Sequence, residues 1–141
     1  MNTLIRSVAG NITINGTAGS NMTAGSNQNR GVQISGAANV SSTGTDDAAN
    51  GRTAGTITIN GTGGAGEDLN DGVFITGGMT QVISVDGDIT IDGTGQQTNN
   101  AGSEDNNRGV VINAGAAVSS TGIDTNDAAM RTDRKSTRLN S

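Results

Sequence analysis

The residues of this sequence that could do chemistry are its carboxylates, because the chain contains neither histidine nor cysteine. Six of them occur as three adjacent pairs, Asp46-Asp47, Glu67-Asp68 and Glu104-Asp105. Two carboxylates beside a sugar can act as general acid and as nucleophile or base, so the pairs raise the hypothesis of a polysaccharide-active enzyme, a lyase or a glycosidase. All three pairs fall in variable stretches rich in Gly, Asn and Asp, where adjacent charges commonly keep a loop solvated. We therefore assign no catalytic residue and predict that the chain is not an enzyme, with a fragment of such an enzyme as the alternative.

A second candidate is the segment Gly63-Gly-Ala-Gly-Glu-Asp68, which matches the first six positions of the calcium-binding pattern Gly-Gly-x-Gly-x-Asp. In a calcium site, carbonyl and carboxylate oxygens must surround one ion. Here the motif occurs once, and the aliphatic Leu69 comes one position early. A solvated glycine-rich loop explains the segment better, so we predict no metal site and no cofactor.

The composition restricts both the core and the partners. Phe74 is the only aromatic residue, so any core must be thin and built from Ile and Val. The net charge is -5, and residues 1–132 carry 5 basic against 12 acidic residues, which gives -7. Such a chain is unsuited to nucleic acid or to an anionic membrane surface. The sequence also has no apolar run of about 18 residues, so we predict no direct membrane insertion.

Internal repeats give the strongest structural signal. Each unit contains three short motifs in the same order, joined by stretches of variable length, and this predicts three strands per unit. The first motif begins at residues spaced by 45 and then 32 positions: Gly10-Asn-Ile-Thr-Ile-Asn-Gly-Thr17, Gly55-Thr-Ile-Thr-Ile-Asn-Gly-Thr62 and Gly87-Asp-Ile-Thr-Ile-Asp-Gly-Thr94. The second motif comprises Arg30-Gly-Val-Gln-Ile34, Asp71-Gly-Val-Phe-Ile75 and Arg108-Gly-Val-Val-Ile112. The third comprises Val40-Ser-Ser-Thr-Gly44, the looser Val82-Ile-Ser-Val85, and Val118-Ser-Ser-Thr-Gly122.

Alternation within the motifs predicts which side chains face inward. In Ile12-Thr13-Ile14 the two isoleucines share one face of the strand and the threonine takes the other. Stacking of equivalent repeats then predicts four aliphatic columns: Ile12, Ile57 and Ile89; Ile14, Ile59 and Ile91; Val32, Val73 and Val110; Ile34, Ile75 and Ile112. The matching outward ladder is Thr13, Thr58 and Thr90, one threonine per Ile-Thr-Ile strand, which strand propensity explains.

These columns predict an all-β fold, a right-handed parallel β-helix (β-solenoid) of about three coils, over residues 1–132. The coils cover approximately residues 9–53, 54–85 and 86–125. At one corner Gly16, Gly61 and Gly93 follow Asn or Asp, where we expect a turn with positive φ. An antiparallel β-sandwich or hairpin array is the alternative, because Asn-Gly also marks tight hairpins.

Both ends of the chain differ from a complete solenoid. Residues 3–10 align without gaps onto residues 80–87, so the chain opens inside a repeat. Uncapped coils predict end-to-end self-association. The segment Asp133-Arg-Lys-Ser-Thr-Arg-Leu-Asn-Ser141 matches neither the repeats nor their composition, and it resembles the translation of a common sequencing adapter at all nine positions. We predict that residues 133–141 are a non-native tail.

Over residues 3 to about 125 the repeats resemble the β-strand repeat regions of large bacterial surface exoproteins, of the filamentous-haemagglutinin-like and autotransporter-passenger type. The resemblance implies a parallel β-helical stalk that is secreted or displayed at the cell surface, outside the outer membrane. It implies a structural or adhesive role, with host or matrix surface glycans or proteins as partners. Binding would fall to the variable loops, which span Thr17 to Asn29, Thr45 to Thr53 and Thr94 to Asn107.

Overall fold

The computed structural model describes residues 3–19, 28–66, 69–96, 107–122 and 137–140. Within them the chain forms short strands and a single 3₁₀ turn, η1 (Ala48–Asn50). No helix of this described part is long and apolar enough to cross a membrane. The strands are β1 (Leu4–Ser7), β2 (Ile12–Thr17), β3 (Val32–Ile34), β4 (Asn39–Ser42), β5 (Ile57–Thr62), β6 (Val73–Thr76), β7 (Gln81–Ser84), β8 (Ile89–Thr94), β9 (Val110–Asn113), β10 (Ala117–Ser120) and β11 (Thr137–Asn140).

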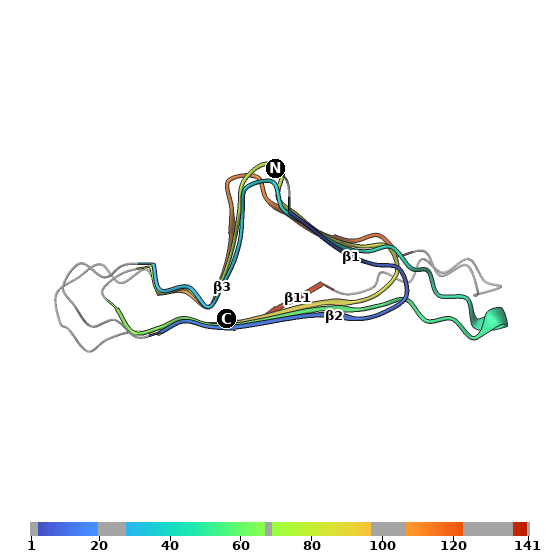
Figure 1. The fold of residues 1–141 in the computed structure, drawn as a ribbon, viewed down its shortest axis with the longest axis horizontal. Coiled ribbons are helices and arrows are strands. Elements are labelled where there is room, and N and C mark those ends of the chain that lie inside the picture. The colour runs from blue at the N-terminus through green and yellow to red at the C-terminus, as the bar shows by residue number, and fades with distance from the viewer. Residues whose placement is uncertain (1–2, 20–27, 67–68, 97–106, 123–136, 141) are drawn as a thin grey trace.

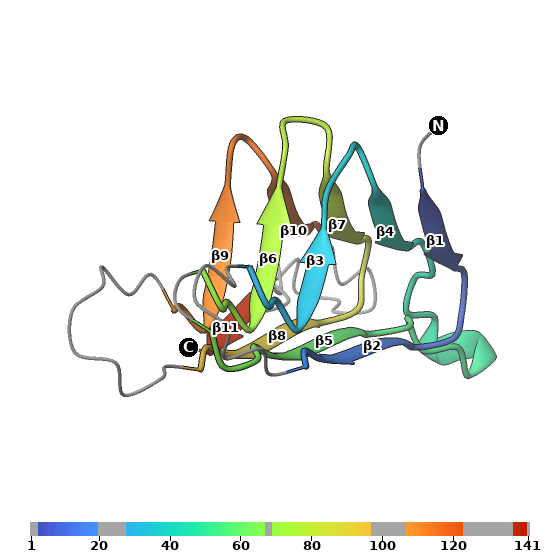
Figure 2. The same cartoon turned by 60° about the vertical axis from the view of Figure 1, so that its left-hand side comes forward.

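The strands form three sheets that wind as a parallel β-helix of about three coils. Sheet A has the order β1-β4-β7-β10, sheet B the order β11-β8-β5-β2, and sheet C the order β3-β6-β9. Every pairing between these strands is parallel. Viewed along the stack, successive coils superimpose around a three-sided outline (Figure 1), and the side view shows the strands of each sheet lying next to one another (Figure 2).

The parallel pairing excludes the antiparallel sandwich or hairpin array. The one antiparallel contact among the described residues is an isolated bridge between Asp47 and Arg52. Asn-Gly therefore does not mark a hairpin here. Instead, Asn15-Gly16 lies inside β2, opposite Asn60-Gly61 of β5.

The register of the strands confirms the four predicted aliphatic columns. Ile12 and Ile14 of β2 lie opposite Ile57 and Ile59 of β5, which in turn lie opposite Ile89 and Ile91 of β8. Val32 and Ile34 continue in the same way through β6 to β9. In sheet A, Ile5, Val40, Val82 and Val118 form a further column that was not among the predicted ones. The alignment of residues 3–10 onto residues 80–87 accounts for its pairing of Ile5 with Val82 as equivalent positions.

The core is thin, aliphatic and best covered in the middle coils. Ile57, Ile59, Val73 and Ile75 are 0% exposed, whereas the corresponding Ile14 in β2 and Val110 and Ile112 in β9 are only partly buried. This difference follows from stacking, because a middle coil is covered on both sides and an end coil on one. Burying each such side chain stabilises the fold by roughly 1.5–3 kcal/mol, so a fully covered side chain of the middle coil contributes more than its partly buried counterpart in an end coil.

The corner glycines serve a different purpose from the one we expected. The glycines with positive φ are Gly36, Gly51, Gly77 and Gly115. Gly16, Gly61 and Gly93 are not among them, so the prediction of a positive-φ turn at these positions is wrong. A Cβ on Gly61 would instead collide with the carbonyl oxygen of Gly72, and the other two glycines meet the carbonyl oxygens of Gly31 and Gly109 in the same way. Glycine is required because sheets B and C approach closely at this corner.

Strand β11 comes from the segment that we predict to be a non-native tail. It lies parallel to β8, with Leu139 opposite Ile91. It thus takes the position that the sheet-B strand of a fourth coil would have. The free edge of a sheet presents unpaired N–H and C=O groups to any extended segment. The pairing thus follows from the open edge of β8 and needs no repeat motif in the paired segment.

Candidate functional site

The most distinctive cluster of charges lies at the start of sheet C, where the second motif of each repeat begins. Arg30, Asp71 and Arg108 occupy equivalent positions in successive coils and form a charge ladder along the stack. Arg30 Nε lies 3.4 Å from Asp71 Oδ2, and Arg108 Nε lies 3.1 Å from Asp71 Oδ1. The Arg108 backbone N–H also donates to Asp71 Oδ1 at 3.3 Å. A cation thus lies on each side of one buried carboxylate.

Burial differs along this charge ladder. The Asp71 side chain is 0% exposed, Arg30 is 10% exposed, and Arg108 is 44% exposed. A buried carboxylate needs partners for its charge and its lone pairs, and here both arginines and one backbone amide supply them. Arg108, at the last described coil of sheet C, leaves much of its guanidinium in water.

An asparagine ladder runs beside the charge ladder, one residue earlier in each repeat. Asn70 Oδ1 accepts from Asn29 N at 3.2 Å and from Asn29 Nδ2 at 3.1 Å. Asn70 N donates to Asn107 Oδ1 at 2.9 Å. In both steps the backbone N–H of one coil therefore donates to the side-chain oxygen of the next.

Outer side chains complete the environment of Arg30. Its guanidinium carbon lies 3.8 Å from the centroid of the Phe74 ring, which is close enough for a cation–π contact. Arg30 Nη1 donates to Gln28 Oε1 and to Gln33 Oε1, both at 3.2 Å. The only aromatic side chain is therefore covered by an arginine, which argues against a role as a platform for a sugar ring.

The two ladders were not predicted from the sequence, although both lie within or directly before an aligned motif. Comparison of the first residue of that motif across the repeats gives Arg, Asp and Arg, an alternation of charge that stacking would bring together. The residue before it is Asn in all three repeats. The apolar, threonine and glycine positions from which the columns and the corner were predicted carry no information about ion pairs.

The first of the three acidic pairs, Asp46-Asp47, stabilises a turn through hydrogen bonds. Asp46 Oδ1 accepts from Ala54 N at 2.6 Å, and Asp46 N donates to Asp86 Oδ2 at 2.7 Å. Asp47 Oδ2 accepts from Asn50 Nδ2 at 2.6 Å. This side-chain hydrogen bond is the main cause that lowers the pKa of Asp47, helped by backbone N–H groups of the turn and by the charge of Arg52.

The carboxylates of Asp46 and Asp47 therefore accept hydrogen bonds that stabilise the loop between β4 and β5. The other two pairs, Glu67-Asp68 and Glu104-Asp105, lie outside the described residues. Across the residues that the structure does describe, no three His, Cys, Asp or Glu side chains gather in a group that could hold a metal ion.

The first two glycines of the calcium-like motif, Gly63 and Gly64, have a packing role. Gly63 N donates to Thr94 O at 2.8 Å and Gly64 N donates to Asn29 O at 2.9 Å, so the segment hydrogen-bonds to the coils on both sides. A Cβ on either glycine would collide with a backbone carbonyl, of Asn70 or of Gly19. Close backbone approach accounts for Gly63 and Gly64. Both are buried between coils, so the prediction of a solvated loop is wrong for these two residues.

The outer face of sheet B carries more threonine than we expected. Thr13, Thr58 and Thr90 stack in register as predicted. Because the strands run on for six residues, a second column of Thr17, Thr62 and Thr94 lies on the same face. A column of Asn15, Asn60 and Asp92 lies between them, in which Asn60 Nδ2 donates to Asn15 Oδ1 at 2.8 Å. The result is a polar face of three columns.

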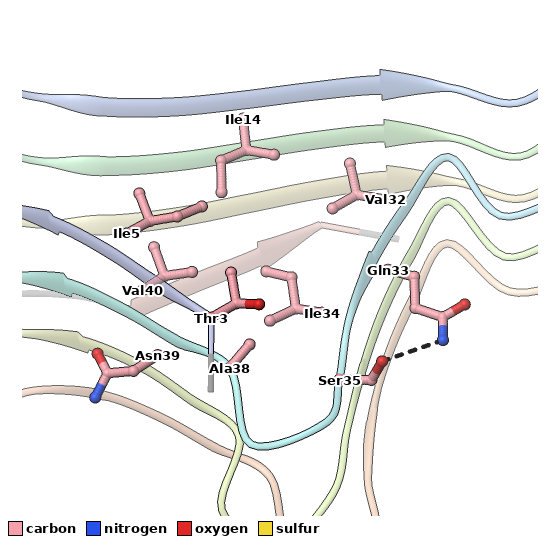
Figure 3. Close-up of a pocket in the computed structure, with 10 residues that line it drawn as sticks. All are labelled: Thr3, Ile5, Ile14, Val32, Gln33, Ile34, Ser35, Ala38, Asn39 and Val40. Atoms are coloured by element: carbon pink, nitrogen blue, oxygen red, sulfur yellow. Dashed lines mark hydrogen bonds between the residues drawn. The ribbon is translucent and has the colours of Figure 1, made fainter. Parts of the chain in front are cut away.

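An apolar cavity opens at the N-terminal end of the stack (Figure 3). It has a volume of about 210 Å³. The labelled side chains of Ile5, Ile14, Val32, Ile34 and Val40 come from all three sheets and belong to the core columns. Ile5 is 41% exposed there, so the cavity is the uncovered end of the core. Its polar lining residues are Thr3, Gln33, Ser35 and Asn39, of which Gln33 Nε2 donates to Ser35 Oγ at 3.3 Å.

Comparison with known proteins adds no assignment. No protein-family model matches the sequence, and no curated protein or solved structure is significantly similar to it.

Proposed function

We propose that this chain is a structural or adhesive repeat segment of a secreted or cell-surface bacterial protein, with no chemistry of its own. The observation that carries the proposal is the register of the strands, in which equivalent residues of successive coils lie opposite one another in all three sheets. Such stacking builds a rigid scaffold that lengthens by adding coils, each of which contacts only its neighbours.

The use of the polar side chains supports a scaffold. Buried Asp71 is neutralised by two arginines of its own chain, and buried Ser42 donates from Oγ to Gly55 O at 2.7 Å. The ion pairs of Asp71 link three successive coils, and the hydrogen bond of Ser42 links the first coil to the beginning of the second. The repeat motifs that motivated the resemblance to bacterial surface exoproteins are the same motifs that stack here, and the proposed location rests on that resemblance alone.

The adhesive role would use surfaces that the scaffold leaves exposed. The outer face of sheet B presents hydroxyl and amide groups in columns, and hydrogen-bonding groups of this kind suit the hydroxyl-rich surface of a glycan. The loop from Thr45 to Thr53 projects from the stack at η1 (Figure 1). Partners of these surfaces would be glycans or proteins of a host or matrix surface.

A binding assay tests this proposal. The full chain is applied to immobilised glycans and matrix proteins, and a triple variant in which Thr13, Thr58 and Thr90 become Val is applied in parallel. Valine keeps the branched shape and removes the hydroxyl. We expect saturable binding to at least one surface that falls at least threefold in the triple variant, since each hydrogen bond contributes about 0.5–1.5 kcal/mol. Thr76→Val, which makes the same change in β6 of sheet C, outside both proposed surfaces, is the control for the outer face of sheet B.

The same samples distinguish the enzyme alternative. Bound polysaccharides are assayed for new reducing ends and for unsaturated sugar products. Binding without cleavage supports an adhesive segment. Cleavage by the wild-type chain would overturn the proposal in favour of a polysaccharide-active enzyme. The absence of both binding and cleavage on these surfaces would remove the adhesive role and leave the structural one.

A further inference from the structure

Three asparagines of this chain directly precede a glycine. Asparagine is a chemically labile residue, and it is most labile in this context, because the glycine nitrogen can attack the side-chain amide carbon without hindrance from a Cβ. The three pairs are Asn15-Gly16, Asn50-Gly51 and Asn60-Gly61, and all of them lie within the described residues. Because the local chemistry of the three pairs is the same, a difference in their reactivity must come from the fold.

Two of the pairs are held inside sheet B. Asn15-Gly16 belongs to β2 and Asn60-Gly61 to β5, and the two pairs lie opposite each other in the parallel ladder. Ring closure requires rotation of the Asn backbone away from the extended conformation, which would break this ladder. A Cβ at either glycine would collide with a carbonyl oxygen across the corner, so the backbone is closely packed there. The side chains are also joined, because Asn60 Nδ2 donates to Asn15 Oδ1 at 2.8 Å.

The third pair lies in the loop between β4 and β5, where η1 ends and the chain projects from the stack (Figure 1). Asn50 and Gly51 are both exposed. Gly51 has a φ of 64°, and no atom of the described residues lies within 4 Å of the position that a Cβ would take. Opening an exposed turn costs less free energy than opening a strand within a ladder. The fold therefore leaves this pair able to rearrange and restrains the other two.

We propose that Asn50-Gly51 is a site of spontaneous covalent modification, at which the asparagine side chain becomes a carboxylate. The Gly51 nitrogen loses its proton and forms a bond to Asn50 Cγ, and the bond from Cγ to Nδ2 breaks with release of ammonia. Water then opens the resulting cyclic imide at either carbonyl, which leaves aspartate or isoaspartate at position 50. Water is the only co-reactant. The proposal goes beyond the structural or adhesive role and holds whether or not the loop binds a partner.

The modification would reverse the contact that closes the turn. Asn50 Nδ2 donates to Asp47 Oδ2 at 2.6 Å. A carboxylate in its place has no proton to donate and carries the same charge as Asp47, so attraction becomes repulsion. Two backbone hydrogen bonds of 2.9 Å also join Asp47 to Arg52 across the turn. Loss of the Asn50 contact should loosen this bridge and expose the backbone at Arg52, while the aliphatic columns keep their packing.

Peptide mapping of the aged protein tests the site. The folded full chain is incubated at mildly alkaline pH, which favours deprotonation of the glycine nitrogen, and is then digested with trypsin. Cleavage after arginine places the three pairs in separate peptides, residues 7–30, 31–52 and 53–108, in which tandem mass spectrometry locates the conversion. We expect Asn50 to convert at least about tenfold faster than Asn15 or Asn60, which corresponds to about 1.4 kcal/mol in the free energy of opening. Incubation in urea should bring the three rates together.

Two variants locate the reaction. Asn50→Gln keeps the amide and the net charge but slows ring closure, because the ring gains one member, so the peptide of residues 31–52 should stay unmodified. Asn60→Gln makes the same change in β5 and should leave the conversion of Asn50 unaltered. Equal rates at the three pairs in the folded chain would overturn the proposal. Conversion that persists in residues 31–52 of the Asn50→Gln variant would also overturn it.

Limited proteolysis tests the effect on the loop. The modified fraction carries one more negative charge and is separated from the unmodified fraction by ion exchange. Brief trypsin treatment of the folded fractions should cut after Arg52 at least about threefold faster in the modified one, the factor that loss of one hydrogen bond supplies. Equal cleavage of the two fractions would overturn the proposed opening of the turn.

Discussion

Asp71 Oδ1 accepts two hydrogen bonds from Arg108, one from Nε at 3.1 Å and one from the backbone N–H at 3.3 Å. The two residues are separated by 37 positions in the sequence and lie in adjacent coils. Arg108 and Arg30 together compensate the negative charge of Asp71, whose side chain is not exposed to solvent. Because removal of one partner from a buried pair leaves the other charge uncompensated, the stability of the stack should depend strongly on Asp71.

The first prediction concerns this carboxylate. Asp71→Asn should lower the free energy of unfolding by about 2–4 kcal/mol, since it leaves Arg30 largely buried without an anion. Arg108→Gln should cost less than about 1 kcal/mol, because its side chain is 44% exposed and water can replace the lost contact. Urea unfolding of both variants measures the difference. Equal losses would show that the charge ladder is not a buried element of the fold.

The second prediction concerns coil position within one aliphatic column. Ile59→Val removes a methylene from a side chain that is 0% exposed and should cost about 1 kcal/mol. Ile14→Val makes the same change one coil earlier, where the side chain is only partly buried, and should cost roughly half as much. Thermal unfolding of the two variants gives the comparison. The reverse order would mean that the end coil, and not the middle one, determines the stability of the stack.

A third prediction concerns the corner between sheets B and C. Gly61→Ala should disrupt the stack, because the new Cβ collides with the Gly72 carbonyl oxygen and neither backbone can move without breaking the ladder. We expect a loss of more than about 2 kcal/mol. Gly19→Ala is the matched control, since no atom lies within 4 Å of the new Cβ there. Circular dichroism and thermal unfolding should show a defect in the first variant alone.

The fourth prediction concerns pH and the turn at η1. The side-chain hydrogen bond from Asn50 lowers the pKa of Asp47, so the ionised form is favoured in the folded loop. This contribution is present above the unfolded pKa near ~4 and is lost as the pH falls through the lower folded value. Asn50→Ala should raise the pKa of Asp47, as followed by NMR titration of its carboxyl carbon. An unchanged pKa would show that Arg52 or the backbone amides dominate.

The repeat motifs were sufficient to predict the core of the fold. Ile12, Ile57 and Ile89 occur in nearly identical motifs, and only stacking of the strands in register covers all three. The inward direction of each side chain follows from the two-residue period of a strand, which is a local property of the backbone. For the same reason, the outward column of Thr13, Thr58 and Thr90 could be predicted before any contact was known.

The contacts between coils could not be predicted in this way, because loops of different length separate the partners. Asp71 lies 41 residues from Arg30 and 37 from Arg108, and their meeting depends on the exact stacking of sheet C. Strand length was also underestimated, which hid the second threonine column at Thr17.

The sequence by itself determined that the chain forms repeated strands with an Ile and Val interior, because burial of a periodic apolar pattern leaves few arrangements open. Only the tertiary structure decided why Gly61 must be glycine and which charges neutralise Asp71. Both depend on distances across the coil stack, where backbone atoms and side chains remote in sequence come within contact, and no local pattern encodes those distances.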